Sequence, residues 1–197
     1  YLWGHLHERQ GNTGKALGHY LSVLQDLPRD PWVHLRTGIL QEQQGEQEQA
    51  LLHYKTASEA YPDSFRILFR RSIVTMNLLQ EEESIRIHQK MIELRPEHAL
   101  SLNNLAWLVL TAKDRSLRKP EKALELALKS VELEATIDHI DTLAEAYFQT
   151  GQTAKAIETL RKGIREASYP KSRERYLEGQ YRRFRKGDTS VSPPPVS

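Results

Sequence analysis

The chain has 197 residues, of which 39% are hydrophobic and 27% charged, which suits one packed domain or a short repeat array. The formal net charge of +2 is too balanced to indicate nucleic-acid binding, and the absence of cysteine excludes disulfides, thiol nucleophiles and cysteine-ligated zinc. No apolar run approaches the roughly 20 residues of a membrane-spanning helix. Leu, Ala, Glu, Gln, Lys and Arg dominate, and runs of β-branched residues are missing, so we expect an all-α fold.

Small residues recur along the chain at a nearly constant interval. The first small position reads Gly4, Gly38, Ser72, Ala106 and, after a longer interval, Ala144. The second small position reads Ala16, Ala50, Ser84, Ala123 and Ala156. Two antiparallel helices approach closely only where side chains are tiny, so this spacing predicts repeated helix pairs that cross at the small residues.

Glycine and proline mark the predicted helix ends. Glycine is expected between the two helices of a pair, where a left-handed residue ends a helix cheaply, and proline after the second helix. The glycines are Gly11, Gly45 and Gly151, and the prolines are Pro28, Pro62 and Pro96. In the third unit Leu79 replaces the turn glycine. Each pair leaves an apolar face that its neighbour covers, so we expect one continuous core.

These markers divide the chain into five units, a terminal helix and a tail. The predicted units span residues 1–30, 31–64, 65–98, 99–135 and 136–170, and together form a repeat array over residues 1–170. In the fourth unit the run "TAKDRSLRKP" adds five residues between the helices, with Pro120 placed to start the second one. Residues 171–188 predict a basic capping helix, and the Pro/Ser-rich residues 189–197 predict disorder.

The pattern resembles the tetratricopeptide repeat (TPR) family from Tyr1 to about Tyr169. The units "YLWGHLHERQGNTGKALGHYLSVLQDLP", "PWVHLRTGILQEQQGEQEQALLHYKTASEAYP" and "HIDTLAEAYFQTGQTAKAIETLRKGI" carry the resemblance most clearly. It implies a right-handed α-solenoid of about five helix-turn-helix units closed by a C-terminal capping helix. The segments "NNLAWLV" and "HIDTLAEAYFQTGQ" are similar to bacterial TPR proteins, which favours a bacterial origin.

In the TPR family, fixed positions of each first helix line a concave peptide-binding groove. Carried over to this chain, those positions are Trp32, Leu35, Arg36, Ile39, Arg66, Phe69, Arg70, Ile73, Asn103, Asn104 and Trp107. In the fifth unit they are Asp138, Asp141, Glu145 and Phe148. Aromatic residues and arginine dominate interface energetics, and the arginine fork suits carboxylates, so we expect an acidic peptide. Alternatively, the tryptophans pack between neighbouring first helices and the arginines are solvated.

The basic C-terminal segment is a rival site. Between Arg161 and Asp188 there are ten Lys or Arg against four Asp or Glu. Six cations on the predicted terminal helix could contact phosphate groups: Arg173, Arg175, Arg182, Arg183, Arg185 and Lys186. A charged outer face is also how a capping helix stays soluble, so we do not expect nucleic acid as a partner.

These observations favour a non-catalytic protein–protein interaction scaffold. The chain lacks a His-Glu-x-x-His motif, a phosphate-binding glycine loop and a nucleophile elbow, so we expect no catalytic residues, metal or cofactor. The alternatives are a self-associating structural module and a regulatory or assembly module of a larger membrane- or secretion-related enzyme complex. Because the chain begins at Tyr1, we expect a piece of a longer protein, either cytoplasmic or periplasmic and membrane-attached through a missing N-terminal part.

Overall fold

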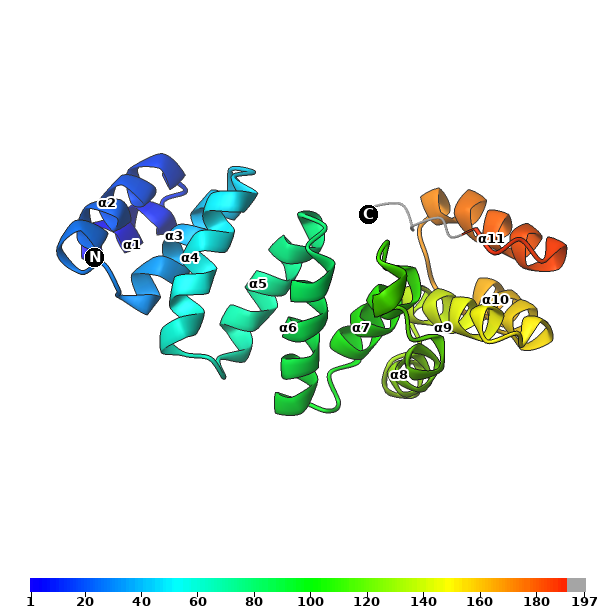
Figure 1. The fold of residues 1–197 in the computed structure, drawn as a ribbon. Coiled ribbons are helices and arrows are strands. Elements are labelled where there is room, and N and C mark those ends of the chain that lie inside the picture. The colour runs from blue at the N-terminus through cyan, green and yellow to red at the C-terminus, as the bar shows by residue number, and fades with distance from the viewer. Residues whose placement is uncertain (191–197) are drawn as a thin grey trace. The chain divides into compact units, whose positions relative to one another are not determined.

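The computed structural model describes residues 1–190, so most of the tail predicted to be disordered, at 191–197, lies outside the described residues. Within residues 1–190 all regular structure is helical, which confirms the expected all-α fold (Figure 1). None of the described helices is long and apolar enough to cross a membrane. The helices form two compact units, one of residues 1–94 and one that begins at Arg95, and each is described by itself.

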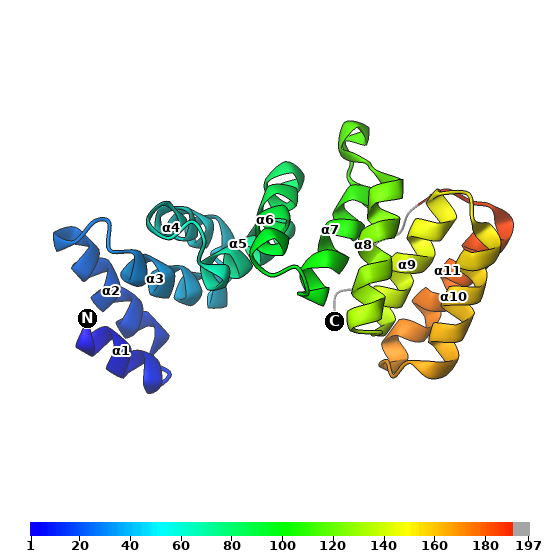
Figure 2. The same cartoon turned by 90° about the horizontal axis from the view of Figure 1, so that it is seen from below.

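Unit 1 consists of three antiparallel helix pairs. Its helices are α1 (Leu2–Arg9), α2 (Thr13–Asp26), α3 (Pro31–Gln43), α4 (Gln47–Ala60), α5 (Phe65–Asn77) and α6 (Glu81–Leu94). Each helix packs on the next one in the chain, and the first helices α3 and α5 also contact each other. The pairs are therefore stacked in chain order within this unit, as the two views show (Figures 1 and 2).

Unit 2 contains two helix pairs and a final single helix. Its elements are α7 (Ala99–Thr111), η1 (Arg115–Leu117), α8 (Pro120–Leu133), α9 (Ile137–Gln149), α10 (Thr153–Glu166), η2 (Lys171–Arg173) and α11 (Glu174–Lys186). The lengthened turn of the fourth pair contains the short helix η1. It is tied back to α7, because the Lys119 amide donates to the Val109 carbonyl at 2.8 Å and the Arg118 side chain to the Ala112 carbonyl at 2.7 Å.

The turn glycines adopt the backbone conformation that the sequence predicts. Gly11, Gly45 and Gly151 have φ angles of 74°, 82° and 76°, in the left-handed region that only glycine enters without cost. Leu79 occupies the equivalent turn of the third pair with a φ of 55°. A branched residue in this region is strained, so the turn of the third pair is less favourable than the others.

A tyrosine of the second helix covers each of the first two small positions. A Cβ atom at Gly4 would lie 2.8 Å from Cε1 of Tyr20, and one at Gly38 would lie 2.7 Å from Cε1 of Tyr54. Both rings are fully buried, and Tyr54 belongs to a core cluster that includes Ile67 of the next pair. The tyrosine therefore closes its own helix crossing and packs on the following repeat, which requires glycine opposite the ring.

This packing predicts that Gly38→Ala destabilises the protein. The added methyl group would overlap the buried ring of Tyr54, and such overpacking costs about 1–3 kcal/mol. The control is Gly18→Ala in the interior of α2, where no atom lies within 4 Å of the new Cβ and the better helix propensity should add roughly 0.5–1 kcal/mol. Urea unfolding of the three proteins checks both signs, and a neutral Gly38→Ala would contradict the crossing described here.

Candidate functional site

Two hydrogen-bonded triplets join successive helix pairs of unit 1. In the first, the Tyr20 hydroxyl donates to Oε2 of Glu8 at 3.0 Å, and Nε of Arg36 donates to the same oxygen at 3.0 Å. Arg36 also forms an ion pair with Glu8 through its Nη2. Glu8 and Tyr20 belong to the first pair and Arg36 to the second, so the triplet spans the joint between them.

The second triplet repeats the first one at the equivalent positions of the following repeat. The Tyr54 hydroxyl donates to Oε2 of Glu42 at 2.5 Å, and Nη1 of Arg70 lies 3.5 Å from Oε1 of Glu42. Burial and the hydrogen bond to Glu42 raise the pKa of Tyr54, so this phenol stays protonated and acts as a donor. In the third pair Met76 and His88 occupy the equivalent positions, 3.4 Å apart between Sδ and Nε2, and the carboxylate and phenol are absent.

The triplets change the interpretation of the two predicted groove arginines. Arg36 and Arg70 were expected to meet a ligand, but each is engaged by a carboxylate of the preceding helix pair. The side chain of Arg70 is 39% exposed, whereas that of Arg36 is 23% exposed. Both arginines therefore serve first as connections between repeats. Sequence reasoning missed Glu8 and Glu42, although they are separated by the same interval as Gly4 and Gly38, which could have revealed them.

Three other predicted site residues are buried. Leu35 and Ile39 lie in the core cluster of unit 1 with Tyr54 and Ile67, and they are 0% and 6% exposed. Asn103 is also buried, on α7 of unit 2. Their helical positions were assigned to the groove by family register, but in this chain the side chains pack inward. They support the site and are not accessible to a ligand.

The remaining predicted residues of unit 1 are accessible. They are Trp32, Arg66, Phe69, Arg70 and Ile73, and we call them the first-helix face of unit 1. Trp32 is 50% exposed, and its ring lies 6.2 Å from that of Tyr61. Arg66 is exposed, while Phe69 is half-buried against the cluster of Leu68, Ile87 and Met91. This face therefore combines the exposed indole of Trp32 and the cation of Arg66 with the half-buried apolar side chains of Phe69 and Ile73.

Asn104 and Trp107 lie on α7, in unit 2, and are half-buried. The predicted site residues are therefore divided between the two units. The Trp107 carbonyl accepts a hydrogen bond from the Thr111 hydroxyl at 2.8 Å, just before the lengthened turn. Among the predicted site residues, the accessible aromatic and basic ones belong mainly to unit 1.

In the fifth helix pair, the predicted groove residues contact the terminal segment of η2 and α11. Asp141, Glu145 and Phe148 are buried there, whereas Asp138 stays exposed. Arg173 forms an ion pair with Asp138 and Arg183 with Glu145, and the Phe148 and Phe184 rings are 4.7 Å apart. The Tyr176 hydroxyl donates to Oδ2 of Asp141 at 2.9 Å. The expectation of an open groove on α9 is therefore wrong, because the terminal helix occupies that face. It also removes Arg173 and Arg183 from the cations that could meet phosphate groups.

Asp141 is buried among charged and polar groups. Burial raises its pKa to about 7, helped by the charge of Glu145, while the hydrogen bond from Tyr176 and the charge of Arg183 act in the opposite direction. Its Oδ1 atom has no hydrogen-bond partner among the described residues. The folded protein thus favours a protonated carboxyl group at this position, since an unpaired buried carboxylate oxygen is costly.

Asp141 should therefore make the protein less stable as pH rises. Its folded pKa of about 7 lies above its ordinary value of 3.8, so between these values the folded state holds a proton that the unfolded chain releases. Stability from this group is complete below the lower value and lost as pH rises towards 7. Asp141→Asn mimics the protonated group, so its melting temperature should exceed the wild-type value at pH 8 and approach it at pH 5.

The exposed carboxyl group of Asp26 provides the control for this prediction. The difference between Asp26→Asn and the wild type should be the same at both pH values, because folding does not bury the Asp26 side chain. A wild-type minus Asp141→Asn difference in melting temperature that does not change between pH 5 and pH 8 would contradict the assignment.

Unit 1 also contains a pair of histidines, of which His34 is buried and His53 half-buried. Nδ1 of His34 lies 2.7 Å from Nδ1 of His53, and Nε2 of His34 lies 3.0 Å from the Pro28 carbonyl oxygen. Burial and the neighbouring His34 lower the pKa of His53 to about 4, so at neutral pH it carries no charge. Because a carbonyl oxygen only accepts, His34 donates to it from Nε2, and in the neutral form of the ring its Nδ1 accepts from His53. No group of three potential metal ligands exists among the described residues.

Comparisons with known proteins agree with this architecture. Two family profiles, both described as tetratricopeptide repeat, match residues 1–65 and 141–168. A search of curated protein sequences gives no match. Solved structures with the same fold include MamA from Desulfovibrio magneticus RS-1, at 18% identity and a TM-score of 0.69, with 82% of this chain and 89% of that chain covered.

Two further structures are similar. One is TTC0263, a thermophilic TPR protein of Thermus thermophilus, at 18% identity and a TM-score of 0.57, covering 93% of this chain and 95% of that one. The other is YrrB, described as a TPR protein with an unusual peptide-binding site, at 16% identity and a TM-score of 0.72, covering 82% of this chain and 81% of that one. At these identities the likeness shows the fold.

Proposed function

Because the chain is a tetratricopeptide repeat protein, we propose that it is a non-catalytic protein-interaction scaffold that binds a peptide segment of a partner along the first-helix face of unit 1. The observation that carries this proposal is Trp32, a large aromatic side chain that is half exposed on a first helix. Indole rings are enriched among residues that dominate binding energy, because they bury much apolar area at little entropic cost.

The surroundings of Trp32 suit a peptide. Helix α3 is fixed at its start by Asp30, whose side chain accepts hydrogen bonds from the Trp32 and Val33 amides at 3.0 and 2.9 Å. The indole is therefore held on a rigid, preformed surface, and preformed surfaces bind with a smaller ordering cost. The fold of YrrB, which is described as having a peptide-binding site, supports this use of the architecture.

The charge of the first-helix face makes an acidic peptide only a secondary part of the proposal. Arg36 and Arg70 already interact with Glu8 and Glu42. Arg66 forms no ion pair within the described residues, so it is the cation that remains for a carboxylate of the ligand. Apolar contact with Trp32 and Ile73 therefore contributes most of the proposed affinity, and Arg66 adds selectivity.

Binding should depend on Trp32 and Arg66 together. Peptides selected by display against the wild-type chain provide the ligand, and titration calorimetry measures the affinity of each variant. Trp32→Ala combined with Arg66→Glu should weaken binding by roughly 2–4 kcal/mol, as expected for an aromatic anchor with an adjacent charge.

The matched control makes comparable changes, an apolar truncation and a charge reversal, on a second helix. Leu52→Ala with Lys55→Glu alters an exposed apolar residue and an exposed cation of α4. This variant should retain wild-type affinity. Equal affinity in all three proteins, or equal loss in both variants, would refute the assignment of binding to the first-helix face.

Self-association is the second candidate function, and α1 carries its supporting observation. Leu2, Trp3 and Leu6 of this helix are 82%, 64% and 43% exposed. Exposed apolar residues gathered on one helix are typical of protein contact surfaces. Sedimentation at increasing protein concentration separates the two candidates, since peptide binding alone leaves the sedimentation coefficient unchanged with concentration.

A further inference from the structure

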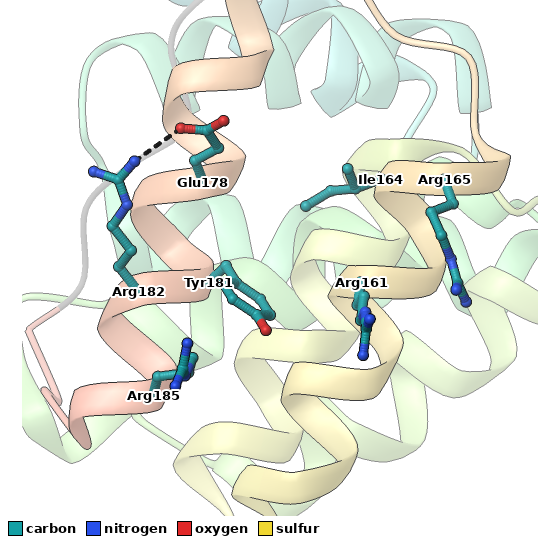
Figure 3. Close-up of a pocket in the computed structure, with 7 residues that line it drawn as sticks. All are labelled: Arg161, Ile164, Arg165, Glu178, Tyr181, Arg182 and Arg185. Atoms are coloured by element: carbon teal, nitrogen blue, oxygen red, sulfur yellow. Dashed lines mark hydrogen bonds and ion pairs between the residues drawn. The ribbon is translucent and has the colours of Figure 1, made fainter.

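A groove lies between the last two helices of unit 2. It has a volume of about 420 Å³ and lies between α10 and α11 (Figure 3). Its lining residues are Arg161, Ile164, Arg165, Glu178, Tyr181, Arg182 and Arg185. Ile164 and Tyr181 are half-buried and form its apolar ground, while the four arginines are exposed around them. Helix α10 supplies two of the arginines and α11 the other two.

The charge of this groove is strongly one-sided. Of its lining residues only Glu178 is acidic, and it pairs with Arg182 at 3.0 Å between Oε2 and Nη2. The Arg185 guanidinium lies 6.0 Å from the centre of the Tyr181 ring. Arg161 and Arg165 form no ion pair with any described residue. Three guanidinium groups thus face solvent around the apolar ground, without a carboxylate partner within the described part of the chain.

The arginines of η2 and α11 fall into two groups. Arg173 and Arg183 point towards α9 and are neutralised there by Asp138 and Glu145. Arg182 and Arg185 are among the residues that line the groove between α10 and α11 (Figure 3). Asp138 and Glu145 therefore have cationic partners of their own, and the groove arginines are not needed to neutralise them. The four groove arginines are exposed, so their clustering is a property of the protein surface.

Tyr181 limits what can occupy the groove. The eighth residue of the first helices α3, α5, α7 and α9 is small, as at Gly38 of α3 and Ala144 of α9, because the second helix of the pair crosses there. The eighth residue of α11 is Tyr181. At Gly38 even a Cβ would lie 2.7 Å from the crossing tyrosine, so a phenol ring prevents an equally close helix. The groove suits a slimmer, extended segment.

We propose that the groove between α10 and α11 binds an extended acidic peptide segment, with an apolar side chain on Ile164 and Tyr181 and flanking carboxylates on Arg161, Arg165 and Arg185. An arginine fork binds a carboxylate with two parallel hydrogen bonds, which matches this arrangement. A polyanion without apolar side chains would leave the ground of the groove uncovered. This site lies in unit 2 and is independent of the peptide surface proposed for unit 1.

The probe is a fluorescein-labelled peptide of alternating glutamate and leucine, measured by fluorescence anisotropy with the whole chain. Its binding should weaken as salt rises, because exposed guanidinium–carboxylate pairs are screened. Arg161→Glu with Arg185→Glu, one change on each wall of the groove, should weaken binding by about tenfold or more. A peptide with glutamine in place of glutamate should bind the wild type as weakly as the acidic peptide binds this variant.

The control Lys129→Glu with Arg175→Glu makes the same change of charge at exposed positions outside the groove. It should keep wild-type affinity, and circular dichroism should show equal helix content in all proteins. Equal loss in both variants would reduce the effect to net charge and overturn the proposal. Tighter binding of single-stranded oligouridylate or of phosphatidylserine vesicles, lost in the groove variant only, would also overturn it in favour of a phosphate-bearing partner.

The apolar ground has its own test. Tyr181→Ser keeps every groove arginine and should weaken binding of the glutamate–leucine peptide by about fivefold to tenfold, with little effect on an all-glutamate peptide. An equal effect on both peptides, at unchanged helix content, would contradict the proposed role of Tyr181 in holding an apolar side chain.

Discussion

The contact of a buried tyrosine ring with a glycine backbone is the constraint on which unit 1 depends. Tyr20 on Gly4 and Tyr54 on Gly38 fix how closely the two helices of a pair approach. The same ring carries its hydroxyl to Glu8 or Glu42, and that carboxylate holds an arginine of the next pair. One side chain thus sets both the crossing within a repeat and the connection to the following repeat.

The parts of this device do not contribute equally. Each tyrosine is fully buried, so its packing removes a large apolar area from water, worth a few kcal/mol. The Glu42–Arg70 pair is partly exposed, and such pairs contribute about 1 kcal/mol or less. The carboxylate matters more because it satisfies the buried phenol, whose donor would otherwise lack a partner. The third pair lacks this phenol and has Leu79 in its turn, so both local supports weaken there.

Sequence periodicity predicted the helix pairs and their turns because these depend on local rules. The regular spacing of glycine and alanine predicts where the helices cross, and Gly11 and Gly45 predict where the first helix of a pair ends. The accessibility of the site residues was not local. Leu35 and Ile39 were assigned to a groove by register, yet whether such a side chain points inward depends on its neighbours. Arg36 could have been assigned correctly from Glu8, which recurs as Glu42 in the following repeat.

The terminal helix was predicted as a basic capping helix, but the polar contacts that it makes with α9 were not. Glu145 is completely buried, and a buried carboxylate is tolerated only with partners. Those partners are Arg183 of α11 and Gln149 of α9, whose amide donates at 2.7 Å. The sequence of α9 does not indicate which later helix supplies the partners of its acids. Asp141 and Glu145 were therefore interpreted as ligand-binding residues. These two acids instead bind the terminal helix, Asp141 through Tyr176 and Glu145 through Arg183.

This selection has a functional consequence for unit 2. A first helix can offer its face to a peptide only if no helix of its own chain covers it. Because Arg173 of η2 pairs with Asp138 and Arg183 of α11 pairs with Glu145, the face of α9 is already occupied. The terminal helix also forms the groove with α10, in which Arg182 and Arg185 lie with Arg161 and Arg165 around Tyr181. The arginines of the C-terminal segment are thus of two kinds. Arg173 and Arg183 are paired with acids of α9, whereas the arginines of the groove are exposed and available to a partner.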